Sequence, residues 1–412
     1  MKNDENRAIG AFYERFPYPP PRGDDAPSGA AAPPSDLGVI QQYVYAGPVP
    51  SSRPFRVLVA GGGTGDAIVS LVHQARARSI DITIDYMDLS ETSLGIAKRR
   101  AKALGVDTAG FVNAPIETLL EGSADRYDYV DIYGVINHVT DQVEVLQAIR
   151  HALTPTGGVG VMAYGASGRS GIYQIQSALS ILGIERDGRG VAQARALLAR
   201  VPEDHPLKTN PINQDIATIS DTEFADRYLN PRDRAFSVRD LTEICHAAGM
   251  RIQGFMPPVL YDPRSMVRDP ELREHVETLH REERWHLAEM LVGTIFKHVF
   301  IVVPSTSLIE PEAVFDNPDS RLHSRGTDLG ELARTLKTHG GDAALSFSHD
   351  TRARKMGVRL NDLEMKVLDQ LVTGMRMGDL PLLFPDSRES DVNAASNRVA
   401  RLLHAILVAD VY

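Results

Sequence analysis

A glycine cluster directly after an apolar run is the feature that most restricts what this sequence can fold into. The run RVLVA at 56–60 is followed by GGGTGD at 61–66, and a helix-like stretch begins near Ala67. Glycine has no Cβ, so a strand that enters a helix through such a turn lets the backbone approach a ligand closely. The segment therefore predicts the first strand, loop and helix of an open α/β sheet with a ligand site.

The spacing of these glycines argues against a dinucleotide. A dinucleotide fingerprint reads G-x-G-x-x-G, and counting from Gly61 through Gly63 places Asp66 where the third glycine or alanine belongs. A carboxylate there also meets the helix N-terminus, where a pyrophosphate would otherwise lie, and like charges repel. The loop instead reads G-x-G-x-G through Gly65, which suits a ligand without phosphate.

Asp88 ends the following apolar run, ITIDYM at 82–87, and supports a nucleoside ligand. A carboxylate at the carboxyl end of the second strand can accept two hydrogen bonds from a ribose diol. The glycine loop and Asp88 together predict a nucleoside cofactor. Taken singly, an ordinary glycine turn and a helix-capping acid are the alternatives.

Further strand-like runs continue the alternation of strands and helices. Helix-length stretches separate most of them, which predicts a parallel sheet with helices on both faces. The stretch from Gly165 to about Ala235 is poor in strand signals and is interpreted as an insertion, and 269–292 is interpreted as one long charged helix. The further strand-like runs lie at 110–113, 128–133, 158–164, 250–256 and 293–304.

The two ends of the chain differ from this pattern. Residues 1–50 begin with a helix-like stretch and pass through FYERFPYPPP into GDDAPSGAAAPPSD, which is typical of a flexible linker or surface loop. Residues 305–412 hold a polar connector and then two amphipathic helices, the first after a cap-like start at Asn361. We expect a mainly helical module that supplies no cofactor ligands and docks in cis, on a partner or in a homodimer.

Composition excludes several classes of protein. The net charge of −10 does not fit a general nucleic-acid binder or a protein of anionic membranes. The single cysteine, Cys245, excludes an internal disulfide or a cysteine-built metal site and is expected to be buried and inert. No secretory signal and no apolar run near the roughly 18 residues of a membrane span is present. We expect a soluble cytoplasmic protein.

Taken together, these residues resemble the class I S-adenosylmethionine-dependent methyltransferases, over about 54–165 and through 236–304. The resemblance implies a Rossmann-like seven-stranded α/β sheet, S-adenosyl-L-methionine as cofactor, and methyl transfer to an O, N or S nucleophile of a small molecule. The implied parts are an N-terminal lid segment and linker at 1–50, a core at 51–165 plus 236–304, an inserted substrate lid at 166–235 and a helical C-terminal domain at 305–412.

The resemblance also implies which residues hold the cofactor. The glycine loop would wrap the methionine part, Asp88 would hold the ribose, the stretch after the third strand would flank the adenine, and the fourth strand would end beside the sulfonium. The residues implied are Gly61, Gly63, Thr64, Gly65, Asp88, Leu89, Ala114, Pro115, Ile116 and Gly134.

FYERFPYPPP resembles the N-terminal lid of a bacterial subgroup of these enzymes. Tyr13 and Tyr18 would then close over the cofactor, since aromatic faces attract a sulfonium; a proline-rich surface strap is the alternative.

Two residues depart from the family pattern. Thr156 stands where a glycine is commoner, and Val59 stands where the family has an acid that helps to hold the cofactor's ammonium end. Asp66 or a backbone carbonyl would have to substitute for that acid.

Methyl transfer is an in-line displacement, so the enzyme aligns a nucleophile and handles its proton. His138, after the fourth strand, is the candidate general base, because imidazole ordinarily titrates near neutrality; a structural histidine is the alternative. Tyr164, with Arg169 and Tyr173 behind it, is the candidate wall of an acceptor pocket.

Other polar groups are weaker candidates. Arg232 and Arg234 are available for a carboxylate, although exposed arginines are usually only solvated. His275, His280 and His286 are spaced by five and six residues, so they face different ways and no metal site is expected.

Three competing functions stay open. The acceptor can be a protein or peptide, docked by the insertion and the C-terminal region. The chain can be a non-catalytic scaffold that binds S-adenosylmethionine, since Val59 departs from the pattern. An NAD-dependent oxidoreductase is the third, and Asp66 opposes it.

Overall fold

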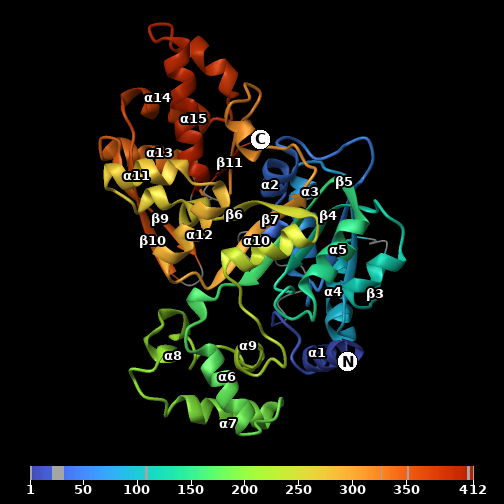
Figure 1. The fold of residues 1–412 in the computed structure, drawn as a ribbon. Coiled ribbons are helices and arrows are strands. Elements are labelled where there is room, and N and C mark those ends of the chain that lie inside the picture. The colour runs from blue at the N-terminus through green and yellow to red at the C-terminus, as the bar shows by residue number, and fades with distance from the viewer. Residues whose placement is uncertain are drawn as a thin grey trace.

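The core of the protein is a seven-stranded sheet in the order β3-β2-β1-β4-β5-β7-β6 (Figure 1). The computed structural model describes residues 2–20, 32–106, 110–325, 327–349, 352–405 and 409–411. Only β7 in this sheet runs antiparallel to its neighbours β5 and β6. The predicted strands are confirmed, although the strand expected at 158–164 begins at Leu153 and the one expected at 293–304 begins at Lys297. They are β1 (Phe55–Ala60), β2 (Ile82–Asp88), β3 (Gly110–Asn113), β4 (Tyr127–Tyr133), β5 (Leu153–Tyr164), β6 (Met250–Met256) and β7 (Lys297–Pro304).

Helices cover both faces of the sheet, as the alternating pattern predicts. One apolar layer joins the sheet to α2 (Leu37–Ile40), α3 (Asp66–Ala77) and α4 (Glu91–Ala103). The opposite layer joins it to α5 (Gln142–Ala152), α10 (Val238–Ala247) and α12 (Arg281–Val292). The inner strands therefore bury both of their faces, which explains their nearly continuous apolar runs, whereas β3 at the sheet edge is partly exposed.

The single long helix expected at 269–292 is wrong, because two helices form there. α11 (Pro270–Thr278) ends before an extended Leu279 and His280. The backbone N–H of His280 then donates to the Glu283 carboxylate at 3.1 Å, which caps a new helix, α12.

The prediction of a linker up to Asp36 is wrong for its last residues. Pro33–Ser35 forms a 3-10 turn beside the sheet, where the Tyr129 hydroxyl donates to the Pro34 carbonyl at 2.7 Å. α2 and a π-helical turn at Gln41–Tyr45 follow, and most of their residues are buried. The earlier part of this stretch, 21–31, lies outside the described residues.

The N-terminal helix and the insertion form one unit. Phe12 of α1 (Lys2–Arg15) and Phe16, which follows this helix, share an apolar cluster with four insertion helices. Figure 1 shows the insertion at the opposite end of the molecule from α13, α14 and α15. The insertion contains α6 (Ile172–Ile181), α7 (Gly188–Leu198), α8 (Pro206–Thr209) and α9 (Asp221–Tyr228).

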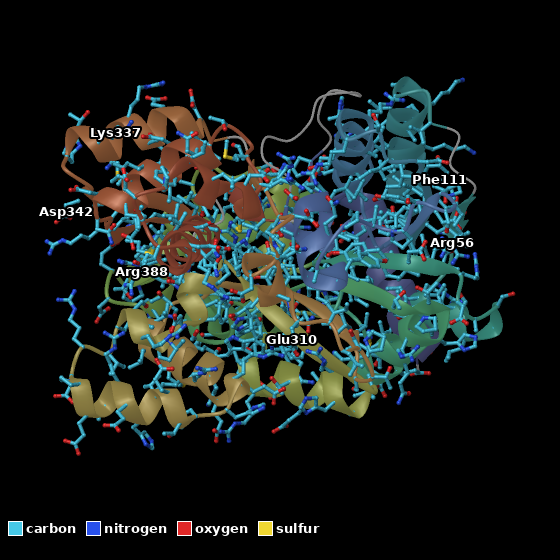
Figure 2. All side chains as sticks on the ribbon, turned by 90° about the horizontal axis from the view of Figure 1, so that it is seen from above. Arg56, Phe111, Glu310, Lys337, Asp342 and Arg388 are labelled. Carbon is cyan, nitrogen blue, oxygen red and sulfur yellow. The ribbon has the colours of Figure 1, made fainter. Side chains whose placement is uncertain are left out.

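The C-terminal region is mainly helical and has its own apolar core. Asn361 caps α14 with Glu364 in a capping box, which confirms the predicted helix start. Two small sheets, which the sequence did not predict, accompany the helices. Figure 2 shows Lys337, Asp342 and Arg388 of this region on the opposite side from Arg56 and Phe111 of the main sheet. Its elements are α13 (Leu329–Thr338), α14 (Asp362–Leu371) and α15 (Glu389–Ala405), with β8 (Leu322–Ser324) paired to β11 (Ala409–Val411) and β9 (Asp342–His349) to β10 (Arg352–Arg359).

The C-terminal region docks on the sheet edge and on the turn after α2. Arg251 of β6 donates to the carbonyls of Ser307 and Ile309 at 3.1 and 3.0 Å. The Tyr43 hydroxyl and His404 Nε2 lie 2.9 Å apart. None of the helices in the described ranges is long and apolar enough to cross a membrane.

Candidate active site

One cavity of about 940 Å³ lies at the carboxyl ends of β1, β2 and β4. Four parts of the chain line it: the N-terminal segment, the sheet domain, the insertion and the C-terminal region. The last of these contributes Arg325 and Thr327. The C-terminal module, expected to supply no cofactor ligands, therefore reaches the cavity wall.

Asp88 organises the glycine loop and faces the same cavity. Its Oδ2 accepts a hydrogen bond from the Gly63 N–H at 2.9 Å, and its Oδ1 accepts from the Ser90 N–H at 2.8 Å. Burial raises the pKa of Asp88, and these backbone hydrogen bonds offset part of that rise. A carboxylate has about four lone-pair directions, so Asp88 can hold the loop and still accept from a ribose diol.

The glycine loop also fastens the N-terminal segment. The Thr64 N–H donates to the Tyr18 carbonyl at 3.2 Å, and the Thr64 hydroxyl donates to the Pro19 carbonyl at 2.8 Å. A Cβ on Gly63, whose φ is +57°, would collide with that Tyr18 carbonyl. Gly63 is therefore required by the close approach of the N-terminal segment, which the sequence did not reveal.

Most of the residues implied for the cofactor line this cavity, and two do not. Thr64 is fully buried beneath the Tyr18–Pro19 segment, and Gly65 is the N-cap residue of α3 and lies close to Ala97 of α4. Their contribution is to the loop and its packing. The residues that do line the cavity are Tyr13, Tyr18, Gly61, Gly63, Asp88, Leu89, Ala114, Pro115, Ile116 and Gly134.

The cavity wall beyond β4 and β5 is aromatic and contains a buried carboxylate. Asp226 of α9 accepts hydrogen bonds from the hydroxyls of Tyr13 at 2.8 Å and Tyr164 at 3.2 Å. Asn230 donates to it at 3.2 Å. Burial, followed by the charge of Asp226, raises the pKa of both tyrosines, so both phenols keep their protons. Asp226 is the site residue that sequence reasoning missed here, and no local pattern marks it.

His138 lies between the two tyrosines. Its ring packs edge-on against Tyr13 and Tyr164, with centroids 6.1 and 5.8 Å away. His138 Nδ1 lies 2.6 Å from the Arg232 carbonyl oxygen. A carbonyl can only accept, so Nδ1 carries the proton and Nε2 presents a lone pair. His138 lines the cavity, and this geometry suits a proton acceptor.

Arg169 supports the Tyr164 wall. Its guanidinium lies 3.8 Å from the centre of the Tyr164 ring and forms an ion pair with Asp233 at 2.5 Å. Both side chains of this pair are buried, and the Tyr173 hydroxyl accepts from Arg169 at 3.1 Å and donates to Asp233 at 3.4 Å. The expected grouping of Tyr164, Arg169 and Tyr173 is therefore present.

The remaining candidates lie elsewhere. Arg232 pairs with Glu5 at 2.6 Å, and Arg234 packs over Phe236; neither arginine lines the cavity. Burial raises the pKa of the Cys245 thiol, which lies inside α10. His275, His280 and His286 lie on or at the start of α11 and α12, and the described part of the chain contains no cluster of metal-ligating side chains.

The strand order with its antiparallel β7, the glycine loop after β1 and the acid after β2 define the fold of a class I S-adenosylmethionine-dependent methyltransferase. Residues 58–159 match a family model described as a methyltransferase domain. The chain is an S-adenosylmethionine-dependent methyltransferase, and the cavity fits that cofactor in its chemistry: a buried acid, apolar residues and aromatic rings line it.

Known proteins resemble the chain over different lengths. PKMT2 from Rickettsia typhi, in complex with S-adenosylhomocysteine (AdoHcy), shares the fold with a TM-score of 0.65 and 15% identity over 96% of this chain and 77% of that one. An uncharacterized protein from Synechococcus is 26% identical over 336 residues, 79% of this chain and 77% of that protein. The tRNA 5-carboxymethoxyuridine methyltransferase of Escherichia coli is 29% identical over 117 residues, 28% of this chain and 42% of that protein.

Replacing Tyr18 with alanine is expected to weaken binding of S-adenosylmethionine more than binding of S-adenosylhomocysteine. Only the former is cationic at sulfur, and a desolvated cation–π contact is worth up to about 2 kcal/mol, or roughly 30-fold. Calorimetric titration of both ligands measures the difference. Tyr18→Phe keeps the aromatic face and should behave like the unchanged protein, whereas equal losses of both ligands in Tyr18→Ala would show that Tyr18 only packs.

Proposed function

We propose that this enzyme methylates a basic nitrogen of a small molecule. The observation that carries the proposal is the Asp226 carboxylate within an aromatic wall at the end of the cavity. The described contacts of Asp226 are all with neutral groups, the hydroxyls of Tyr13 and Tyr164 and the amide of Asn230. A buried carboxylate without a cationic partner favours a ligand that brings positive charge.

Two arginines near Asp226 are already paired with other acids, which supports this reading. Arg227 forms ion pairs with Asp215 at 2.7 Å and with Glu223 at 3.2 Å. Arg169 is paired with Asp233. Asp226 therefore remains the negative group of this wall, and the rings of Tyr13, Tyr18, Tyr133, Tyr164 and Phe296 surround the same space. Aromatic faces and a carboxylate together are the surroundings that an alkylammonium group prefers.

The side chains divide the work of the reaction. S-adenosylmethionine, when bound, supplies an electrophilic methyl group. Asp226 would attract and orient an ammonium acceptor, and a proton must leave the nitrogen before it can attack. His138 Nε2 would accept that proton, because Nδ1 is held by the Arg232 carbonyl. α1 and the insertion would cover the site and exclude water.

A methyl-transfer screen tests this proposal. The full chain is incubated with methyl-labelled S-adenosylmethionine and with low-mass and protein fractions of a lysate, followed by amines, alcohols and thiols of matched size. We expect label in low-mass amines. Label in the protein fraction would indicate a peptide acceptor, and label in alcohols or thiols alone would contradict the assigned nitrogen.

Replacing Asp226 with asparagine should lower kcat/KM for the amine by about ten- to a hundredfold, since a hydrogen bond to a charged group is worth about 1.5–3 kcal/mol. Binding of S-adenosylhomocysteine, which is neutral at sulfur, should stay unchanged. Asp221→Asn is the matched control, because Asp221 is an exposed acid of the same helix that pairs with Arg195. An unchanged kcat/KM in Asp226→Asn would remove the basis for a cationic acceptor.

A further inference from the structure

A buried acid lies in the cavity wall on the strand beside Val59. Asp131 of β4 lines the cavity, and its Cα is the register partner of Val59 in β1. The side chains of Val59 and Asp131 point to the same face of the sheet, because paired residues of neighbouring strands share a face. An acid that β1 lacks at Val59 is therefore found at the paired position of the neighbouring strand, β4.

Asp131 is held in one orientation. Its Oδ2 accepts from the Ser35 hydroxyl at 2.5 Å, and its Oδ1 accepts from the Tyr133 N–H at 3.0 Å. Burial raises the pKa of Asp131 to about 6 despite these two hydrogen bonds. Each oxygen keeps a further lone pair, so the carboxylate can accept from a ligand ammonium, whose charge would offset the cost of burial.

A cation from the C-terminal region borders the same end of the cavity. Arg325 directly follows β8, and its Nη2 forms an ion pair with Asp36 at 3.0 Å. Asp36 is the neighbour of Ser35, whose hydroxyl holds Asp131. The Arg325 side chain is 8% exposed, and Arg325 lines the cavity. A guanidinium has five N–H donors and can engage more than one carboxylate.

We propose that Asp131 and Arg325 hold the amino-acid end of S-adenosylmethionine, with Asp131 binding its ammonium group and Arg325 its carboxylate. The C-terminal region is then part of the cofactor site. This inference rests on the methyltransferase assignment and is independent of the acceptor proposed above. Opposite charges at one end of the cavity match the two charges of an α-amino acid.

The position of Asp131 relative to Asp88 agrees with this assignment. β2 and β4 flank β1, and Asp88 lies about two residues further along the sheet, so their Cα atoms are roughly 12 Å apart. About eight bonds separate the ribose hydroxyls from the amino nitrogen of the cofactor, a reach of roughly 9 Å. The side chains of Asp88 and Asp131, each with one hydrogen bond to the cofactor, span the difference between these two lengths.

Asp66, the substitute considered from the sequence, is less suited to an ammonium. Its Oδ1 forms an ion pair with Arg100 Nη1 at 2.7 Å, and Arg100 is fully buried against α3. This guanidinium already supplies the positive charge that Asp66 requires, so a second cation gains less there.

Truncated ligands test the proposal in the full-length chain. Calorimetry measures S-adenosylhomocysteine, its decarboxylated analogue and methylthioadenosine, which lacks the amino-acid end. Asp131→Asn should weaken S-adenosylhomocysteine about ten- to a hundredfold and leave methylthioadenosine unchanged. Arg325→Gln should weaken S-adenosylhomocysteine by a similar factor and leave the decarboxylated analogue unchanged.

Two matched controls separate this role from general destabilisation. Asp128→Asn removes a buried acid of the same strand that pairs with Arg53 outside the cavity. Arg321→Gln removes an arginine of the same segment that donates to the Gly374 carbonyl. Both controls should keep full affinity. Equal losses of all three ligands, or no loss, in either test variant would overturn the proposal. If Asp131→Asn does not fold, Arg325→Gln still decides it.

Discussion

Replacing Asp88 with alanine is expected to weaken binding of S-adenosylhomocysteine by about two to four orders of magnitude. Two charge-assisted hydrogen bonds to the ribose would be lost, each worth about 1.5–3 kcal/mol when buried. The substitution also removes the hydrogen bonds that Asp88 accepts from the N–H groups of Gly63 and Ser90. The glycine loop would then be held less firmly, which lowers the affinity further. Calorimetric titration of the full chain measures the change.

A ligand without the diol separates these two contributions. The 2′,3′-dideoxy analogue of S-adenosylhomocysteine should bind Asp88→Ala and the unchanged protein with much more similar affinities. Asp85→Asn is the matched control, since Asp85 lies on the same strand and accepts from the Tyr127 hydroxyl at 2.8 Å. An Asp88→Ala protein that binds S-adenosylhomocysteine normally would contradict the assignment of the ribose to Asp88.

Replacing His138 with glycine is expected to lower kcat by about a hundred- to ten thousandfold, the usual contribution of a positioned proton acceptor. Binding of S-adenosylhomocysteine should change little. Added imidazole should restore part of the rate, because it can fill the space between Tyr13 and Tyr164 and accept the proton. Single-turnover kinetics with the identified acceptor measures both effects.

His151→Gln is the control for this experiment. His151 also contacts a carbonyl, that of Gly122 at 3.1 Å, but lies outside the cavity wall. The variant should turn over at the normal rate. A drop in kcat of less than about tenfold in His138→Gly, or a larger drop that imidazole does not relieve, would assign His138 to packing alone.

The sheet could be predicted because its signals are local. Each strand is a short apolar run, and β2 (Ile82–Asp88) was expected at 82–87 and found within one residue. Asp88 was found for the same reason, since the end of a strand and the following turn are adjacent in sequence. The glycine loop likewise combines its strand, turn and helix in one stretch.

Features that depend on distant parts of the chain could not be predicted. Ser35 lies in a segment rich in proline and alanine, and its burial depends on the sheet beneath it. In the sequence, Asp226 is one of several acids of a polar helix, and only the packing of the insertion against α1 places it in the site. Asp131 becomes the counterpart of Val59 only through strand register, and Arg325 reaches the cavity only through the docked C-terminal region.

The most direct test of the central claim is calorimetric titration of the full chain with S-adenosylhomocysteine and, separately, with NAD. The carboxylates of Asp88 and Asp131 and the guanidinium of Arg325 line the cavity, and Asp66 at the start of α3 opposes a pyrophosphate. We predict one molecule of S-adenosylhomocysteine bound per chain and no measurable binding of NAD. A well-folded protein that binds NAD, or that binds neither ligand, would contradict the account.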